Sequence, residues 1–152
     1  MVEALVAMSL IVVGLLGVFT LLSRSLSLNR VIANQYAGVM LASEGIELAK
    51  NLLDHNVLLG NVAWNSGIAD GEYESDYNDL TLSVYADRFL DFDSGSGVYS
   101  YDAGPATNFK RKITIKNDAN GQSVQVITYV NWITRGGGES SIQLEDTFFN
   151  WR

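Results

Sequence analysis

The feature that most constrains this chain is an uncharged apolar run near its amino terminus. Twenty residues from Ala4 to Ser23, ALVAMSLIVVGLLGVFTLLS, carry no charge between Glu3 and Arg24. A helix rises about 1.5 Å per residue, so the run reaches roughly 30 Å, the thickness of the hydrocarbon core of a bilayer. A cleavable secretory signal needs a basic start, a shorter apolar core and a small-residue exit, which are lacking here. We therefore predict a membrane-spanning helix that is retained.

The helical pattern continues beyond this run. Apolar residues recur every three or four positions, as on one face of a helix, and no proline precedes Pro105. We therefore predict one continuous helix from Val2 to about Asp54, roughly 80 Å long. Its first half is apolar all round, and Gly14 and Gly17 are the positions where it could loosen or where a neighbouring helix could pack closely. The predicted face of the amphipathic half consists of Leu28, Ile32, Tyr36, Val39, Ala42, Ile46, Ala49 and Leu53.

Beyond the helix, the pattern becomes that of strands. Residues 55–79 mix Gly, Asn and acids without a sustained period, which predicts a surface connection. Alternating apolar and polar residues then predict antiparallel strands, with residues 94–97 as a hairpin turn. The strand 123–134 is apolar on both faces, which indicates a central position, and the alternation of the last strand breaks near Asp146, which indicates a bulge. The predicted strands are 80–85, 88–93, 98–102, 109–116, 123–134 and 140–151.

Together these elements predict an α+β fold. Three or four antiparallel strands in a meander leave one face to be covered, and the amphipathic half of the helix is the element long enough to cover it. Ala42 and Ala49 are small enough to let that helix approach closely. We therefore expect a transmembrane or filament-core segment over residues 1–24 and a globular head over residues 25–152. The head comprises a half-helix over 25–54, a connection over 55–79 and strands over 80–151.

The residue inventory argues against an enzyme. Seventeen acidic residues against ten basic ones give a net charge of −7, which repels phosphate backbones and argues against general nucleic-acid binding. The absence of cysteine excludes thiolate catalysis and cysteine-based metal sites. The one histidine, His55, directly follows the predicted helix, where an imidazole usually contacts the last carbonyls. No nucleotide-binding or hydrolase motif is present, so we predict no catalytic residue, cofactor or metal site.

One cluster of charge is acidic. Residues 70–102 hold nine acids against Arg88 alone. The run from Asp91 to Gly95 resembles the opening of a calcium loop, but position twelve of that loop is Asp102 rather than glutamate, and the residues between read as strand. We therefore interpret the region as a solvated acidic face that includes a turn.

A second cluster is basic and lies on the predicted strand 109–116. Lysines on an outward or edge strand commonly prevent aberrant pairing between sheets. The alternative is contact with DNA or with an acidic neighbour, and the acidic region 70–102 of another copy would then be a partner that requires no further molecule. The candidates for such inter-subunit electrostatics are Lys110, Arg111, Lys112 and Lys116.

The amino-terminal region also carries a family resemblance. The segment MVEALVAMSLIVVGLLGVFTLLSRS resembles the amino-terminal region of type IV pilins and pseudopilins, over about the first 50 residues of the chain. In that family a peptidase cuts after a glycine, the new terminal residue is usually an N-methylated phenylalanine, and a glutamate stands at the fifth mature position. Glu3 matches that glutamate by context but stands third, which implies two mature residues before Met1. The chain departs from the family in lacking a helix proline and the frequent carboxy-terminal disulfide.

The resemblance implies a structural role. The chain would be a pilin that resides in the inner (cytoplasmic) membrane and then polymerises with copies of itself into a filament at the cell surface. Its partners would be a prepilin peptidase and the pilus assembly machinery, and Glu3 would pair with the amino terminus of an adjacent subunit. The alternative for Glu3 is a marker of the membrane boundary. The alternatives for the chain are a minor pilin or pseudopilin of a secretion or DNA-uptake system, or a membrane-tethered adhesive or binding module.

Overall fold

A computed structural model describes residues 1–151 of the chain. Its helix α1 (Val2–Leu59) confirms the predicted continuous helix, but it ends at Leu59 rather than at Asp54. The helix continues because no glycine or proline occurs before Gly60 in this region, and Gly60, with a φ of 68°, supplies the left-handed residue that ends it. The Gly60 N–H donates to the Asn56 carbonyl at 3.4 Å.

The chain divides into two compact units, residues 1–36 and the residues from Ala37 onward. The first unit is helical from Val2 to its end. The second, called the sheet unit below, combines the rest of α1 with the strands. The predicted division between residues 24 and 25 refers to a membrane boundary, so it stays a prediction.

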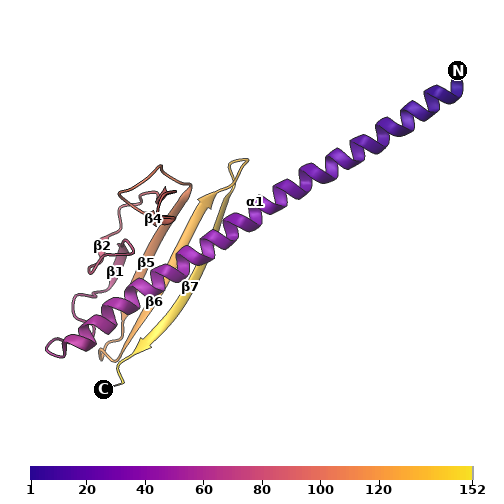
Figure 1. The fold of residues 1–152 in the computed structure, drawn as a ribbon. Coiled ribbons are helices and arrows are strands. Elements are labelled where there is room, and N and C mark those ends of the chain that lie inside the picture. The colour runs from indigo at the N-terminus through magenta and orange to yellow at the C-terminus, as the bar shows by residue number, and fades with distance from the viewer. Residues whose placement is uncertain (152) are drawn as a thin grey trace. The chain divides into compact units, whose positions relative to one another are not determined.

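The sheet unit contains a five-stranded antiparallel sheet in the order β2-β1-β5-β6-β7. A separate pair, β3 (Asp91–Asp93) and β4 (Val98–Ser100), forms the predicted hairpin. The part of α1 from Ala37 lies across one face of the large sheet (Figure 1), so the predicted α+β layout is confirmed. The strands of the large sheet are β1 (Gly71–Glu74), β2 (Ser83–Val84), β5 (Phe109–Asn117), β6 (Ser123–Ile133) and β7 (Glu139–Phe149).

Two strands at one edge of the sheet differ from the prediction. β1 lies inside the predicted connection 55–79 and pairs with β5, so the sheet has five strands rather than three or four. The sequence of β1, Gly-Glu-Tyr-Glu, is too short for its alternation to stand out from a loop. β2 comprises Ser83–Val84 rather than the predicted 80–85, and it pairs with β1.

The remaining strands form the predicted meander. β6 pairs along its length with both β5 and β7, which confirms its central position. β7 pairs with β6 without interruption from Glu139 to Phe149, so the predicted bulge near Asp146 is wrong. Phe149 is the last residue of β7 and lies on the face opposite to Phe148, and Trp151 follows the strand, so these two apolar side chains are 52% and 90% exposed without any bulge.

Close approach between α1 and β6 is made by glycines. A Cβ on Gly45 would lie 2.6 Å from Thr128 Cγ2, and a Cβ on Gly38 would lie 2.7 Å from Trp132 Cζ3. Glycine is therefore the residue that lets the helix backbone reach the sheet at these two turns.

The buried face of α1 is only partly the predicted one. The predicted Ala42 and Ala49 are fully buried. Leu28, Ile32 and Tyr36 are exposed, so the prediction is wrong for them in the isolated chain, where burial begins at Gly38. The buried residues of α1 are Gly38, Leu41, Ala42, Gly45, Leu48, Ala49, Leu52 and Leu53.

Candidate assembly segment and polar clusters

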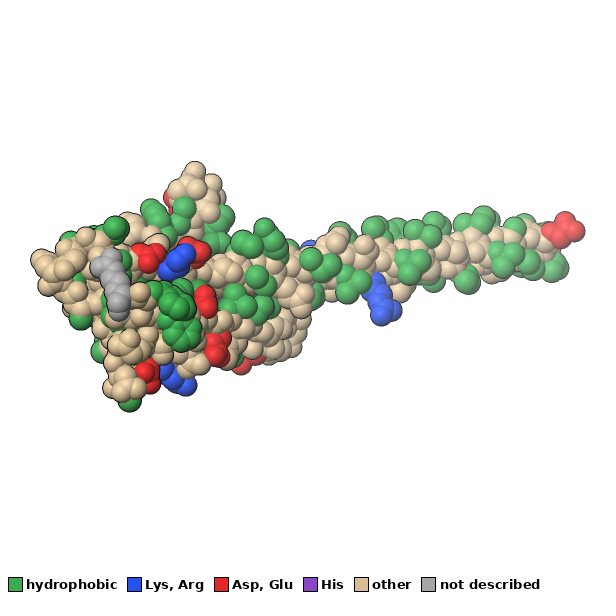
Figure 2. Space-filling model, turned by 90° about the horizontal axis from the view of Figure 1, so that it is seen from below, with side chains coloured by type: hydrophobic (Ala, Val, Ile, Leu, Met, Phe, Trp, Pro, Cys, Tyr) green, Lys and Arg blue, Asp and Glu red, His purple; other side chains and the backbone are tan. Residues whose placement is uncertain are grey.

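The amino-terminal stretch of α1 is long and apolar enough, by length and composition, to cross a membrane. None of that stretch is buried within the chain. The large apolar side chains from Val2 to Leu22 are each 52–73% exposed, and Figure 2 shows hydrophobic side chains along this part of the helix on the face in view. A continuous apolar surface of this size marks an interaction site with lipid or protein.

Two hydroxyl groups in this segment bond to the helix itself. The Ser9 hydroxyl donates to the Val6 carbonyl at 2.8 Å, and the Thr20 hydroxyl donates to the Leu16 carbonyl at 2.8 Å. Such bonds give these two hydroxyls a partner without water. The segment therefore tolerates these two residues in an apolar environment.

The predicted assembly residues lie on the exposed helix. Glu3 is in the first turn, where a carboxylate also interacts favourably with the helix dipole. A Cβ placed on Gly14 or Gly17 would have no neighbour within 4 Å, so both positions are open to a packing helix. The helix is regular at both glycines, and the roles of the three residues stay predictions.

The basic cluster on β5 is divided between the two faces of the sheet. Lys110 Nζ lies 2.7 Å from Asp87 Oδ2, and Lys112 Nζ lies 2.6 Å from Glu72 Oε1. The acidic region 70–102 of the same chain therefore supplies their partners. Because side chains alternate along a strand, Arg111 points to the opposite face from these two lysines.

Arg111 is fully buried, so it cannot belong to an inter-subunit surface, and this part of the prediction is wrong. The inter-subunit role of Lys110, Lys112 and Lys116 stays a prediction. Lys116 is exposed and has no ion pair within residues 1–151.

The guanidinium of Arg111 joins three segments of the sheet unit. It donates to the Ser75 carbonyl at 2.7 Å and to the Leu41 carbonyl at 3.4 Å, and it lies 3.0 Å from Glu44 Oε1 on α1. The Tyr101 hydroxyl donates to the Arg111 carbonyl at 3.2 Å. Arg111 therefore connects β5 to the helix and to the loops that follow β1 and β4.

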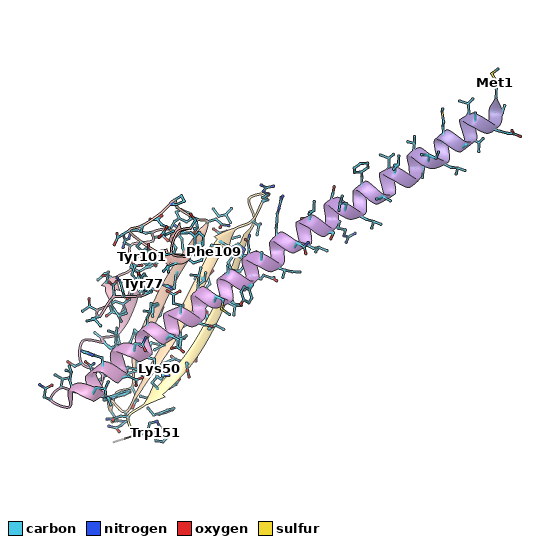
Figure 3. All side chains as sticks on the ribbon, viewed as in Figure 1. Met1, Lys50, Tyr77, Tyr101, Phe109 and Trp151 are labelled. Atoms are coloured by element: carbon cyan, nitrogen blue, oxygen red, sulfur yellow. The ribbon has the colours of Figure 1, made fainter. Side chains whose placement is uncertain are left out.

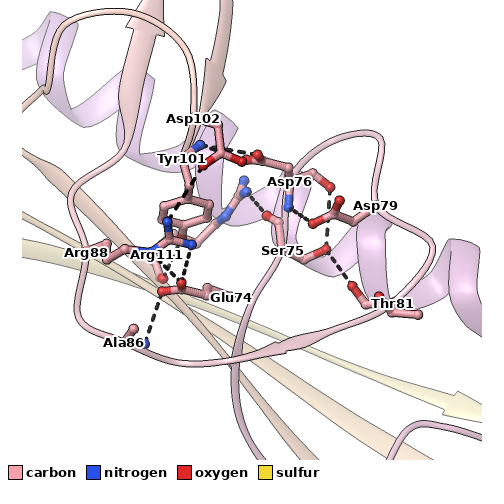
Figure 4. Close-up of polar contacts among 10 residues, drawn as sticks. All are labelled: Glu74, Ser75, Asp76, Asp79, Thr81, Ala86, Arg88, Tyr101, Asp102 and Arg111. Atoms are coloured by element: carbon pink, nitrogen blue, oxygen red, sulfur yellow. Dashed lines mark hydrogen bonds and ion pairs between the residues drawn. The ribbon is translucent and has the colours of Figure 1, made fainter.

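A second buried charge lies beside it (Figure 4). Glu74 is 2% exposed and accepts hydrogen bonds from Arg88 Nε at 2.7 Å and from the Ala86 N–H at 3.1 Å. The Arg88 guanidinium lies 4.7 Å from the centre of the Tyr101 ring. Burial raises the pKa of Tyr101 to about 12. The interpretation of the whole acidic region as a solvated face is therefore wrong for Glu74, because a buried carboxylate requires such partners.

The calcium-like sequence forms the turn between β3 and β4. Asp93 accepts hydrogen bonds from the Ser96 hydroxyl at 2.7 Å, the Gly95 N–H at 2.9 Å and the Ser96 N–H at 3.2 Å. These bonds, the Ser96 hydroxyl first, hold the pKa of Asp93 below its ordinary value. Residues 1–151 contain no group of three or more His, Asp or Glu side chains placed to hold a metal ion.

His55 lies within α1 rather than directly after it, because the helix extends to Leu59. Its side chain is exposed and lines a hollow of about 220 Å³ with Asn56, Ile68 and Leu82. The amide of Asn56 donates to the Ser66 carbonyl at 2.7 Å, which ties the loop to the helix end. Within residues 1–151 the His55 side chain makes no hydrogen bond to the last carbonyls of α1, so the predicted contact is wrong.

A larger hollow of about 380 Å³ lies where α1, the loop at Trp64 and the end of β7 meet. Lys50 on α1 and Trp151 after β7 both line it and are labelled in Figure 3. Sequence reasoning misses this hollow because its residues come from three separate segments with no shared motif.

Comparison of the chain with protein-family models, with curated proteins and with solved structures finds no match. The function must therefore be argued from the residues of the chain itself.

Proposed function

We propose that this chain is a structural subunit of a type IV pilus-like filament, held in the inner membrane before assembly and at the cell surface afterwards. The observation that carries the proposal is the exposed, uncharged helical run from Ala4 to Ser23, which begins one residue after Glu3 and belongs to the same helix that covers the sheet. The resemblance of this region to pilins supports the same function, with a prepilin peptidase and the assembly machinery as partners.

The energetics favour lipid first and self-association afterwards. Thirteen large apolar side chains between Ala4 and Ser23 are more than half exposed in the isolated chain. Fully burying an exposed side chain of this kind stabilises the system by about 1.5–3 kcal/mol, so burying the exposed part of these thirteen contributes on the order of 10–20 kcal/mol. Exposure to water is therefore untenable. Outside the membrane, equivalent helices of other copies would supply the same apolar surroundings.

Glu3 is the residue that distinguishes a filament subunit from a plain anchor. An anchor has no need of a carboxylate at the apolar end of its helix. In a filament core, the carboxylate would pair with the amino terminus of an adjacent subunit, and removing one partner of a buried pair costs about 3–5 kcal/mol.

The test is Glu3→Ala. We expect normal membrane insertion, because an alanine only lengthens the apolar run, together with a large loss of surface filaments relative to the membrane pool. Glu47→Ala is the matched control, since Glu47 is an exposed glutamate on the sheet-unit part of the same helix. Equal filament yield for wild type and Glu3→Ala, at equal subunit levels, would contradict the assembly mechanism.

Processing provides a separate prediction. If Glu3 stands at the fifth mature position, the native chain begins two residues before Met1 and carries an N-methyl group. Mass spectrometry of the intact native protein measures both properties. An unmodified native chain that starts at Met1 would refute the register.

A further inference from the structure

The strongest unassigned feature is the hollow of about 380 Å³ beside the end of β7. Its volume falls within the range of small-ligand sites, about 300–1,000 Å³. It lies entirely in the sheet unit, so a ligand can bind there whether or not the chain assembles into filaments. The residues that define its chemistry are Lys50, Asp54, Trp64, Thr147, Phe149 and Trp151.

Aromatic rings form its walls. The Trp64 ring is fixed, because its Nε1–H donates to the Gly121 carbonyl at 2.9 Å. The Phe149 and Trp151 rings lie 5.8 Å apart, centre to centre, and are tilted by 57°. With Trp151 90% exposed, a large amphipathic ring is presented to solvent rather than to the core. These rings offer flat apolar faces to a ligand.

Two opposite charges stand beside the rings. Lys50 and Asp54 are four positions apart, so they lie on the same side of α1 on successive turns. Both are exposed, and neither has an ion pair or a side-chain hydrogen bond within residues 1–151. The neutral polar residues of the lining are Thr147 and Asn150. The pocket therefore offers an apolar face together with one strong donor and one strong acceptor.

This combination restricts the class of ligand. A purely apolar ligand would desolvate Lys50 and Asp54 without giving them partners. A simple anion would be repelled by Asp54, and a simple cation would be repelled by Lys50. A sugar ring has an apolar C–H face for the aromatic walls, and its hydroxyls both accept from an ammonium and donate to a carboxylate. We propose that this pocket binds a neutral sugar residue.

The test is saturation-transfer NMR on the full chain in lauryldimethylamine oxide micelles, which contain no sugar headgroup. The probes are the methyl glycosides of glucose, galactose, mannose and N-acetylglucosamine, at up to about 50 mM, well above a millimolar Kd. At least one glycoside is expected to bind saturably. Trp151→Ala should weaken that binding at least about tenfold, because it removes one stacking face. Tyr77→Ala, which removes another exposed aromatic side chain outside the pocket, should change it less than twofold.

Several outcomes would overturn the proposal. They are the absence of saturable binding by all four glycosides, equal binding by wild type and Trp151→Ala, or displacement of the glycoside by L-phenylalanine, which would show that a zwitterion is the preferred ligand. Because Trp151 follows the last strand and is exposed, the variant is expected to keep the thermal unfolding midpoint of the wild type. The glycoside-binding result is independent of whether Glu3→Ala loses its filaments.

Discussion

Replacing Arg111 with methionine tests how much the buried Arg111 guanidinium stabilises the sheet unit. Methionine has a similar apolar stem, so the change removes the guanidinium while filling most of the same volume. The Ser75 carbonyl loses a hydrogen bond of 2.7 Å from a charged donor, and Glu44 loses its partner at 3.0 Å. Both losses occur where α1, β5 and the loop after β1 meet.

The expected magnitude follows from burial. The Arg111 side chain is 0% exposed, so its bond to Ser75 counts as a buried charged hydrogen bond, about 1.5–3 kcal/mol. Glu44 is 33% exposed and can turn to solvent, so its ion pair contributes nearer to 1 kcal/mol. We expect a loss of about 3 kcal/mol in the free energy of unfolding. For a chain of this size that loss lowers Tm by roughly 6–12 °C.

The assay is thermal unfolding of the full chain in detergent, followed by near-ultraviolet circular dichroism. Lys112→Met is the matched control, because it removes an ion pair from the next residue of the same strand. Lys112 and its partner Glu72 are 29% and 52% exposed, so the loss of this ion pair should cost less than about 1 kcal/mol. Indistinguishable Tm values for the two variants would refute the argument that burial sets the difference.

Two further predictions concern the packing and the titration of the sheet unit. Gly45→Ala should reduce the free energy of unfolding by about 1–2 kcal/mol despite the better helix propensity of alanine, because its Cβ would lie 2.6 Å from Thr128 Cγ2. Gly14→Ala is the control, since a Cβ at that position has no neighbour within 4 Å. Urea unfolding of the two variants measures the difference. Tyr101→Phe should cost about 1 kcal/mol at pH 8, through loss of the hydrogen bond to the Arg111 carbonyl. Burial raises the pKa of Tyr101 to about 12, so above pH 10 this tyrosine ionises in the unfolded chain before it ionises in the folded one. The stability advantage of the wild type over Tyr101→Phe should therefore shrink between pH 10 and 12. A stability advantage that grows over this range would contradict the prediction.

Features that depend on local pattern can be read directly from the amino-acid sequence. The continuous helix follows from apolar periodicity without a proline, and the meander β5–β6–β7 follows from three long strand-forming runs separated by turns that contain glycine. The central position of β6 follows from apolar residues on both of its faces. In each case, one segment carries the whole signal. The uncharged apolar run from Ala4 to Ser23 can likewise be recognised in the sequence alone.

Contacts between distant segments become visible only in the folded chain. Alternation places Arg111 on the packed face of β5, but only the fold brings the Ser75 and Leu41 carbonyls and Glu44 to it. The pairing of β1 with β5 comes from the sheet edge rather than from any pattern in its four residues.

The same reason applies to the helix face and to the aromatic pocket. Gly38 and Gly45 become the contact side of α1 because Trp132 and Thr128 of β6 lie against them, and a helical wheel cannot show which apolar side meets a sheet. The pocket at Trp151 requires three chain segments to end at one place. Local periodicity specifies elements, whereas partners across long sequence separations are chosen by the packing of the whole unit, which no single segment encodes.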